Sequence, residues 1–140
     1  MKTTIVVVCC TFAVAQPSLA DAPAGHYEIS DTVLDRGTGL RWQRMAAPGV
    51  YDWDQAFKYC NDLGGGWRLP AVKELLTIVD PTLADPAIDP KAFPQMPAEL
   101  QFWAVTFYTN MVGVGWQVGF SEGTAQAYPA NDLASVRCVR

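Results

Sequence analysis

Two cysteines, Cys60 and Cys138, constrain the fold of this 140-residue chain more than any other feature. The other two of its four cysteines, Cys9 and Cys10, belong to an apolar N-terminal segment. In an exported chain of this size, an even pair of cysteines favours one disulfide. A bridge between Cys60 and Cys138 would close a loop of about 80 residues, which the chain-entropy estimate values at about 4.5 kcal/mol. Such a bridge would hold the first helix to the last residues of the chain.

The N-terminal segment has the features of a secretory signal peptide. Lys2 gives it a positive start, and the apolar run that follows is too short to span a bilayer comfortably. Ala20 ends a Ser-Leu-Ala sequence with small residues where signal peptidase cuts. We therefore expect removal of residues 1–20 and a periplasmic or secreted mature chain. The alternatives are lipidation at Cys9 or Cys10 and retention of the segment as an anchor.

The charged residues argue against nucleic acid as a partner. Ten basic side chains stand against 14 acidic ones, for a formal net charge of -4, whereas nucleic-acid binders normally carry a basic face. Half of the residues are hydrophobic, which is enough for a globular core. Beyond residue 20, no apolar run is long enough to form a transmembrane segment. We expect a linker over residues 21–27 and one domain over residues 28–140.

Local patterns predict strands at both ends of the mature chain. Residues 26–30 favour a short strand, and residues 32–43 favour a hairpin with two glycines in its turn. Further strands are expected near residues 101–106, 116–120, 124–128 and 134–140. In the last of these, alternation would place Val136, Cys138 and Arg140 on one face, and Arg137 and Val139 on the other.

Two helices are expected between these strands. The first should begin after Asp52, an N-cap with Gln55 in the capping-box position, and end at glycines 64–66. The second should follow at once and stop at Asp80. Residues 81–100 hold five of the ten prolines but remain apolar, so they should be irregular and packed on the domain. The expected inward stripes are Trp53, Ala56, Phe57, Cys60 and Leu63 in the first helix, and Val72, Leu75, Leu76 and Val79 in the second.

A set of short motifs occurs in a fixed order along the chain. The motifs are Thr38-Gly39-Leu40-Arg41-Trp42-Gln43, Tyr59-Cys60, Trp67-Arg68-Leu69-Pro70 with Glu74-Leu75, Ala92-Phe93-Pro94, Phe102-Trp103, Trp116-Gln117-Val118-Gly119-Phe120 with Gly123, and Val136-Arg137-Cys138-Val139-Arg140. This ordered set resembles the Lcl C-terminal domain family, a bacterial group long filed as a domain of unknown function. The resemblance covers residues 28–140, nearly the whole mature chain.

The resemblance implies an α+β, C-type-lectin-like fold, in which two helices pack on short antiparallel sheets with long irregular loops. In that fold a disulfide joins the first helix to the last strand, which are the positions of Cys60 and Cys138. Members of the family tend to be exported or surface-exposed, and some are terminal modules of bacterial adhesins. The Trp-Arg-Leu-Pro motif is also similar to one in the formylglycine-generating enzymes, which share this fold.

The chain offers few groups for catalysis. A formylglycine-generating enzyme uses reactive cysteines and copper, and the expected disulfide occupies both remaining cysteines. His26 lies alone near the mature N-terminus, where a solvent-exposed or locally bonded role is expected. Asp52 and Asp54 are explained as a helix cap and as a first-turn acid that the helix dipole favours. We therefore expect no catalytic residue and no cofactor.

Metal-ligating patterns are weak as well. Zinc sites need three or four Cys or His ligands, and the sugar-binding triplets of calcium-dependent C-type lectins do not occur in the sequence. Asp80, Asp85 and Asp89 could form a calcium site, but turn-capping roles explain them better. Arg68 and Glu74 are close enough to pair as part of the scaffold. We expect no metal site.

The loops beside the C-terminal strands are the remaining candidate site. They carry aromatic side chains beside amide and acid groups, a combination that stacks on sugar rings or anchors a protein partner. We assign Trp42, Trp53 and Trp67 to the core rather than to a ligand platform. The candidate ligand-binding residues are Phe107, Tyr108, Asn110, Tyr128, Asn131 and Asp132.

These observations together predict a non-catalytic recognition module that binds a protein or a glycan through its loops without calcium. A structural or assembly module of the bacterial envelope is the first alternative. An enzyme related to the formylglycine-generating group is the second.

Overall fold

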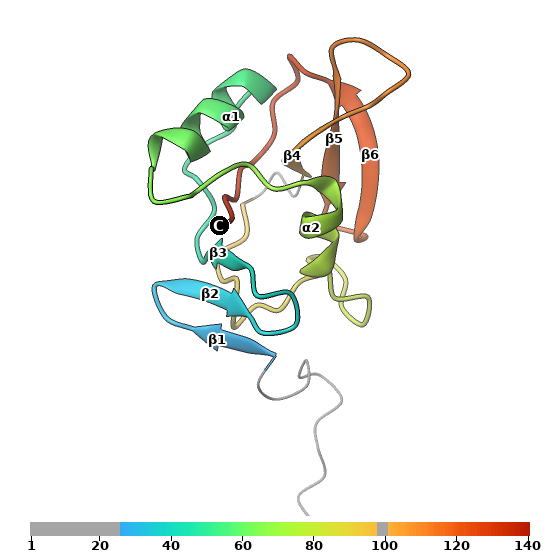
Figure 1. Ribbon diagram of the computed structural model, residues 1–140. Coiled ribbons are helices and arrows are strands. Elements are labelled where there is room, and N and C mark those ends of the chain that lie inside the picture. Colours follow the sequence, from blue (N-terminus) through green and yellow to red (C-terminus); the bar gives the residue numbers. More distant parts are fainter. Residues whose placement is uncertain (1–25, 98–100) are drawn as a thin grey trace, which may run out of the picture.

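The computed structural model describes residues 26–97 and 101–140, so the expected signal peptide and most of the expected linker lie outside the described residues. The described part is a small α+β fold with two antiparallel sheets, ordered β1-β2-β3 and β4-β5-β6 (Figure 1). The elements, in chain order, are β1 (Tyr27–Ile29), β2 (Thr32–Asp35), β3 (Arg41–Gln43), α1 (Trp53–Asp62), α2 (Val72–Thr77), β4 (Gln101–Phe107), β5 (Val114–Gly119) and β6 (Thr124–Pro129).

The first sheet confirms the predicted strand and hairpin. Val33 of β2 pairs with Trp42 of β3, and both side chains are fully buried. The buried carboxylate of Asp35 organises the turn, because its Oδ1 accepts from the Gly37 amide at 2.8 Å and its Oδ2 accepts from the Thr38 hydroxyl at 2.7 Å. β1 begins at Tyr27, one residue before the expected start of the domain.

Helix α1 begins with the predicted capping box. The Gln55 amide donates to Asp52 Oδ1 at 2.8 Å, and the Asp52 amide donates to Gln55 Oε1 at 3.2 Å. Ala56 faces the core, but Phe57 and Leu63 of the expected stripe are 41% and 44% exposed. The stripe prediction is wrong at these two positions, because so short a helix buries only the narrow side that carries Cys60.

Helix α2 is held by the predicted pair of Arg68 and Glu74. The guanidinium donates two hydrogen bonds to the carboxylate, at 2.7 and 2.6 Å, and Glu74 Oε2 also accepts from the Ala71 amide at the start of the helix. These bonds lower the pKa of Glu74. Leu76, expected to face inward, is 39% exposed, and Ile78 is buried instead. The helix ends at Thr77, so the turn after it directs Ile78 rather than Leu76 into the core.

The strands predicted near residues 101–106, 116–120 and 124–128 are confirmed as β4, β5 and β6. Strand β4 is covered on both faces. Phe102 and Ala104 belong to a core cluster with Leu75 of α2, whereas Trp103 belongs to a second cluster with Ala56 of α1. Burial on both faces explains why this strand is almost continuously apolar rather than alternating.

The proline-rich stretch packs on the domain, as predicted, over its described residues 81–97. Ile88 and Phe93 are fully buried. The Ala87 amide donates to the carbonyl of Phe120 at 2.6 Å, just beyond β5. Residues 98–100 of the same stretch lie outside the described residues.

The prediction of a regular strand over residues 134–140 is wrong. The segment pairs at isolated points with several different neighbours instead of along one strand, and its bridges reach Trp42, Tyr51, Arg68 and Phe102. It passes through the middle of the molecule, beside β3 and α1 (Figure 1). Because it has neighbours on all sides, residues 134–139 are all buried, on both of the faces that alternation predicts, and only Arg140 of the segment is exposed.

Arg137 is the clearest consequence of this burial. Its side chain is fully buried, and its Nη1 donates to the carbonyls of Gln43 and Arg44, both at 2.6 Å. The guanidinium carbon lies 4.8 Å from the ring centre of Phe93 and 5.6 Å from that of Phe102. Burial lowers the pKa of Arg137 to about 9. The cation is therefore held by carbonyl oxygens and aromatic faces.

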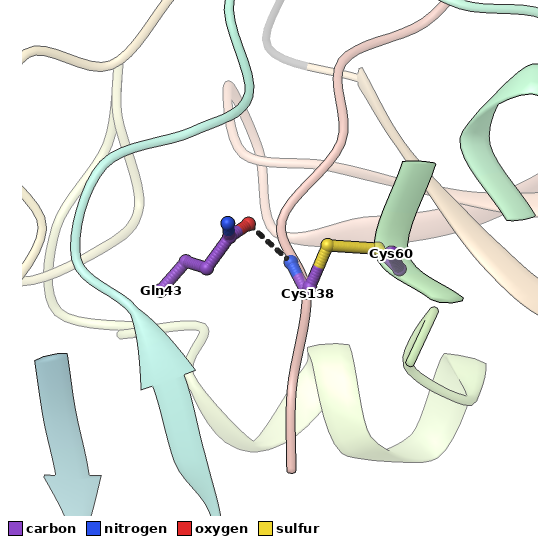
Figure 2. Close-up of a disulfide and its surroundings, with 3 residues drawn as sticks. All are labelled: Gln43, Cys60 and Cys138. Carbon is purple, nitrogen blue, oxygen red and sulfur yellow. Dashed lines mark hydrogen bonds between the residues drawn. A yellow bond between two sulfur atoms is a disulfide. The ribbon is translucent and has the colours of Figure 1, made fainter. Parts of the chain in front are cut away.

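The predicted disulfide between Cys60 and Cys138 is present, with the two Cα atoms 5.5 Å apart. It joins α1 to the C-terminal segment, and both cysteines are fully buried. Figure 2 shows that the Cys138 amide also donates to the side-chain oxygen of Gln43, at 2.9 Å. One residue thus links α1, the C-terminal segment and β3.

Replacing both cysteines with alanine should lower the free energy of unfolding by about 2–5 kcal/mol, because the unfolded chain regains the freedom of a long loop. Urea denaturation of the oxidised mature protein and of C60A/C138A checks this. A change below about 1 kcal/mol would show that the bridge is incidental to the stability of the fold.

Replacing Glu74 with glutamine should destabilise the protein by up to about 1 kcal/mol near neutral pH, since the pair is partly exposed. A carboxylate whose pKa is lowered by folding stabilises the fold above its unfolded pKa and loses that effect as the pH falls through its folded pKa. The difference between wild type and E74Q should therefore shrink as the pH falls below the ordinary pKa of a glutamate and vanish once the pH is below the lowered pKa of Glu74 in the folded protein. Urea titrations at several pH values test this, and a difference that persists in acid would contradict it.

Candidate functional site

A hollow of about 490 Å³ opens at one end of the molecule. It lies where the β4–β5 connection, drawn in orange in Figure 1, meets the start of α1 and residue 130. Its apolar lining residues are Trp53, Phe107, Met111, Val112, Gly113 and Ala130. Its polar lining residues are Asp54, Tyr108 and Thr109.

Backbone hydrogen bonds join the three segments that form the hollow. The Tyr108 amide donates to the Val114 carbonyl at 2.8 Å, which closes the β4–β5 connection. The Ala130 amide donates to the Gly113 carbonyl at 2.8 Å, and the Trp53 amide donates to the Ala130 carbonyl at 2.9 Å. The three segments that form the hollow are therefore held together by backbone hydrogen bonds.

Trp53 forms one wall of the hollow. Its indole Nε1 donates to the Ala104 carbonyl at 2.9 Å, which fixes the ring against β4. The ring centre lies 4.4 Å from that of Phe107 and 5.4 Å from that of Phe57. A Cβ atom at Gly115 would come within 3.2 Å of both Trp53 and Trp103. Gly115 thus provides the space in which this wall is packed.

Large apolar side chains around the hollow are unusually exposed. Phe107 is 43% exposed, Met111 is 60% exposed and Val112 is fully exposed. They are neighbours on one surface, and contiguous apolar patches on soluble proteins often mark a binding surface.

The structure places the predicted ligand-binding residues unequally. Phe107 and Tyr108 line the hollow. Asn110 lies in the β4–β5 connection but is not among the lining residues. Tyr128 packs against the core cluster of α1, and its hydroxyl lies 3.2 Å from Gln126 Oε1. Asn131 and Asp132 are exposed and follow the lining residue Ala130, without lining the hollow themselves.

Sequence reasoning missed Trp53, Asp54, Met111 and Val112. Trp53 matched the core stripe of a helix, and it does pack on the core, but it also forms a wall of the hollow. Asp54 matched a first-turn acid. An available signal was the Met111-Val112 pair, since two large apolar residues between strands are unusual at a loop tip.

Asp54 supplies the only charge among the described residues that line the hollow. It is exposed and stands at the second position of α1. Within residues 26–97 and 101–140, its carboxylate has no hydrogen bond or ion pair.

The other titratable candidates lie in structural roles. His26 Nε2 is 3.4 Å from the Asp35 carboxylate. Asp80 accepts from the Thr82 amide at 2.9 Å, and Asp89 accepts from the Lys91 amide at 2.7 Å, so both carboxylates cap their own turns. The described residues contain no cluster of three or more His, Cys, Asp or Glu suited to a metal ion. In the same part of the chain, no helix is long and apolar enough to cross a membrane.

Comparison with solved structures shows a fold similar to that of botrocetin, a C-type-lectin-like protein. The TM-score is 0.50 and the sequence identity 11%, over 86% of this chain and 98% of the botrocetin chain. At this identity the likeness concerns the fold alone. The search of curated proteins returned no significant match.

Comparison with protein families returns the resemblance noted from the motifs. The family described as the Lcl C-terminal domain matches residues 31–140, which is most of the sequence and nearly all of the described fold. The matched range includes both cysteines of the disulfide and every segment that forms the hollow. The chain belongs to the Lcl C-terminal domain family.

Proposed function

We propose that the protein is an exported, non-catalytic recognition module with a C-type-lectin-like fold, and that it binds a protein partner through the hollow. The observation that carries this proposal is the group of exposed apolar side chains at a hollow whose backbone is already fixed. Its volume of about 490 Å³ is in the range of ordinary ligand pockets and suits a few side chains of a partner.

The composition of the hollow favours a protein over a glycan. Aromatic residues and methionine are enriched at protein–protein interfaces, and Trp53, Phe107 and Met111 all line this hollow. A sugar site combines an aromatic face with a ring of hydrogen-bonding groups. Here the most exposed apolar side chain at the hollow is that of Val112, which is aliphatic and offers a sugar no hydrogen bond.

The cysteines and carboxylates that an enzyme of either kind would need are already bonded or stand alone, which supports a non-catalytic role. The disulfide leaves neither Cys60 nor Cys138 as the free thiol that a formylglycine-generating enzyme uses. Glycoside hydrolysis typically needs two facing carboxylates, and Asp54 is the single carboxylate among the described lining residues.

Export is supported by the same disulfide and by the N-terminal sequence. Disulfides persist in oxidising compartments such as the periplasm or the medium. In this proposal the mature chain starts after Ala20 and is periplasmic or secreted.

Replacing Met111 and Val112 together with serine should reduce binding of peptide probes by about tenfold or more, because the apolar anchors of the hollow are lost. The probes are linear peptides selected from a random phage-displayed library on the immobilised mature protein. Binding is measured by fluorescence anisotropy with wild type and M111S/V112S. Both side chains are well exposed, so the fold should be unaffected.

Ile29→Ser is the matched control, since Ile29 is 43% exposed like Phe107 but lies in β1, outside the hollow. Gly115→Val gives a second test, once circular dichroism shows that the variant is folded, because its side chain would crowd Trp53 in the wall of the hollow as well as Trp103 in the core. Peptides that bind M111S/V112S and G115V as well as wild type would contradict the proposal. So would a failure to select any peptide while a glycan array gives binding that depends on Met111 and Val112.

A further inference from the structure

We infer that the partner segment carries a lysine or arginine beside its apolar anchor, and that Asp54 binds this cation at the edge of the hollow. The inference rests on the proposed function and adds the chemistry of the partner to it.

The carboxylate of Asp54 has no hydrogen bond or ion pair among the described residues, and it is the one carboxylate among them that lines the hollow. Exposed Glu28 lies 3.4 Å from Arg36, and exposed Asp62 is paired with Lys58 on the same helix. Asp52 already caps α1 by accepting from the Gln55 amide. The helix therefore has its cap, and the Asp54 side chain is left without a partner among the described residues.

The surroundings of Asp54 disfavour a partner segment that is entirely apolar. A peptide that filled the hollow would cover Trp53 and Met111 and would remove water from the neighbouring carboxylate. Removing water from a charge costs free energy unless an opposite charge or a hydrogen bond replaces it. None of the described lining residues is basic, so an opposite charge for this carboxylate would come from the partner, and a charged donor compensates it more strongly than a neutral one.

The same charge argues against the other occupants of an apolar surface. A second copy of this chain would add its own net charge of -4, and a symmetric contact would bring two Asp54 carboxylates together. Exposed Asp132, two residues beyond the lining residue Ala130, adds to the negative field. Anionic lipid, nucleic acid and acidic glycans are repelled for the same reason. A polypeptide segment that carries an apolar side chain next to a lysine or arginine complements both the apolar lining of the hollow and the Asp54 carboxylate.

The test uses the peptides selected on the wild-type protein. Their sequences should be enriched in Lys or Arg next to Leu, Ile, Met or an aromatic residue. Replacing that base with glutamine in a synthetic peptide should weaken binding to wild type by roughly 5–20-fold and to D54N by less than about twofold. High salt should reduce the effect of the peptide's charge on wild type. Selection on D54K should favour Asp or Glu at the same place.

Glu122→Gln is the matched control, because it removes one exposed acidic charge in the β5–β6 turn, away from the lining residues. This variant should behave as wild type. The inference is overturned, while the proposed function stands, if M111S/V112S weakens peptide binding but neither D54N nor replacement of the peptide's lysine or arginine does. If binding requires neither Met111 nor Val112, both fail. A dimer that forms in wild type and dissociates in M111S/V112S would also overturn the inference, in favour of a second copy.

Discussion

Backbone hydrogen bonds from the last seven residues hold the parts of this fold to one another. Arg41 and Arg140 exchange two bonds of 2.9 Å, and Arg68 and Val139 exchange two of 2.9 and 3.0 Å. The amide of Ser135 donates to the Gln101 carbonyl of β4 at 2.8 Å. The disulfide then ties α1 to the same segment. Because the two sheets share no strand, this segment joins them through backbone hydrogen bonds, to β3 on one side and to β4 on the other.

The same segment sets the position of the hollow. Tyr51 and Ala134 exchange two backbone bonds, and the Tyr51 carbonyl also accepts from the Trp103 indole at 2.8 Å. These contacts fix the residue just before the cap of α1, so Trp53 begins the helix beside residue 130 and the β4–β5 connection. The exposed apolar side chains of the hollow therefore project from a rigid frame, which reduces the entropy that binding would cost.

The features predicted from the sequence are those with local or covalent causes. The capping box at Asp52, the hairpin turn and the disulfide each depend on a few residue types at fixed spacing. Features set by distant neighbours escaped prediction. Residues 134–140 alternate like a strand, yet residues 134–139 are buried on every side because several segments surround them. The hollow was half predicted, through Phe107 and Tyr108, since Trp53 and Asp54 come from a helix more than 50 residues earlier in the sequence.

Residue-resolved hydrogen exchange of the mature protein tests most directly whether the C-terminal segment is the frame of the fold. If it is, the amides of Ser135, Val139 and Arg140 exchange only through global unfolding, with an opening free energy equal to that from urea denaturation. The amides of Trp53 and Ala130, which join the walls of the hollow, should be protected as well. Opening of residues 135–140 at a much lower free energy than global unfolding would contradict the account.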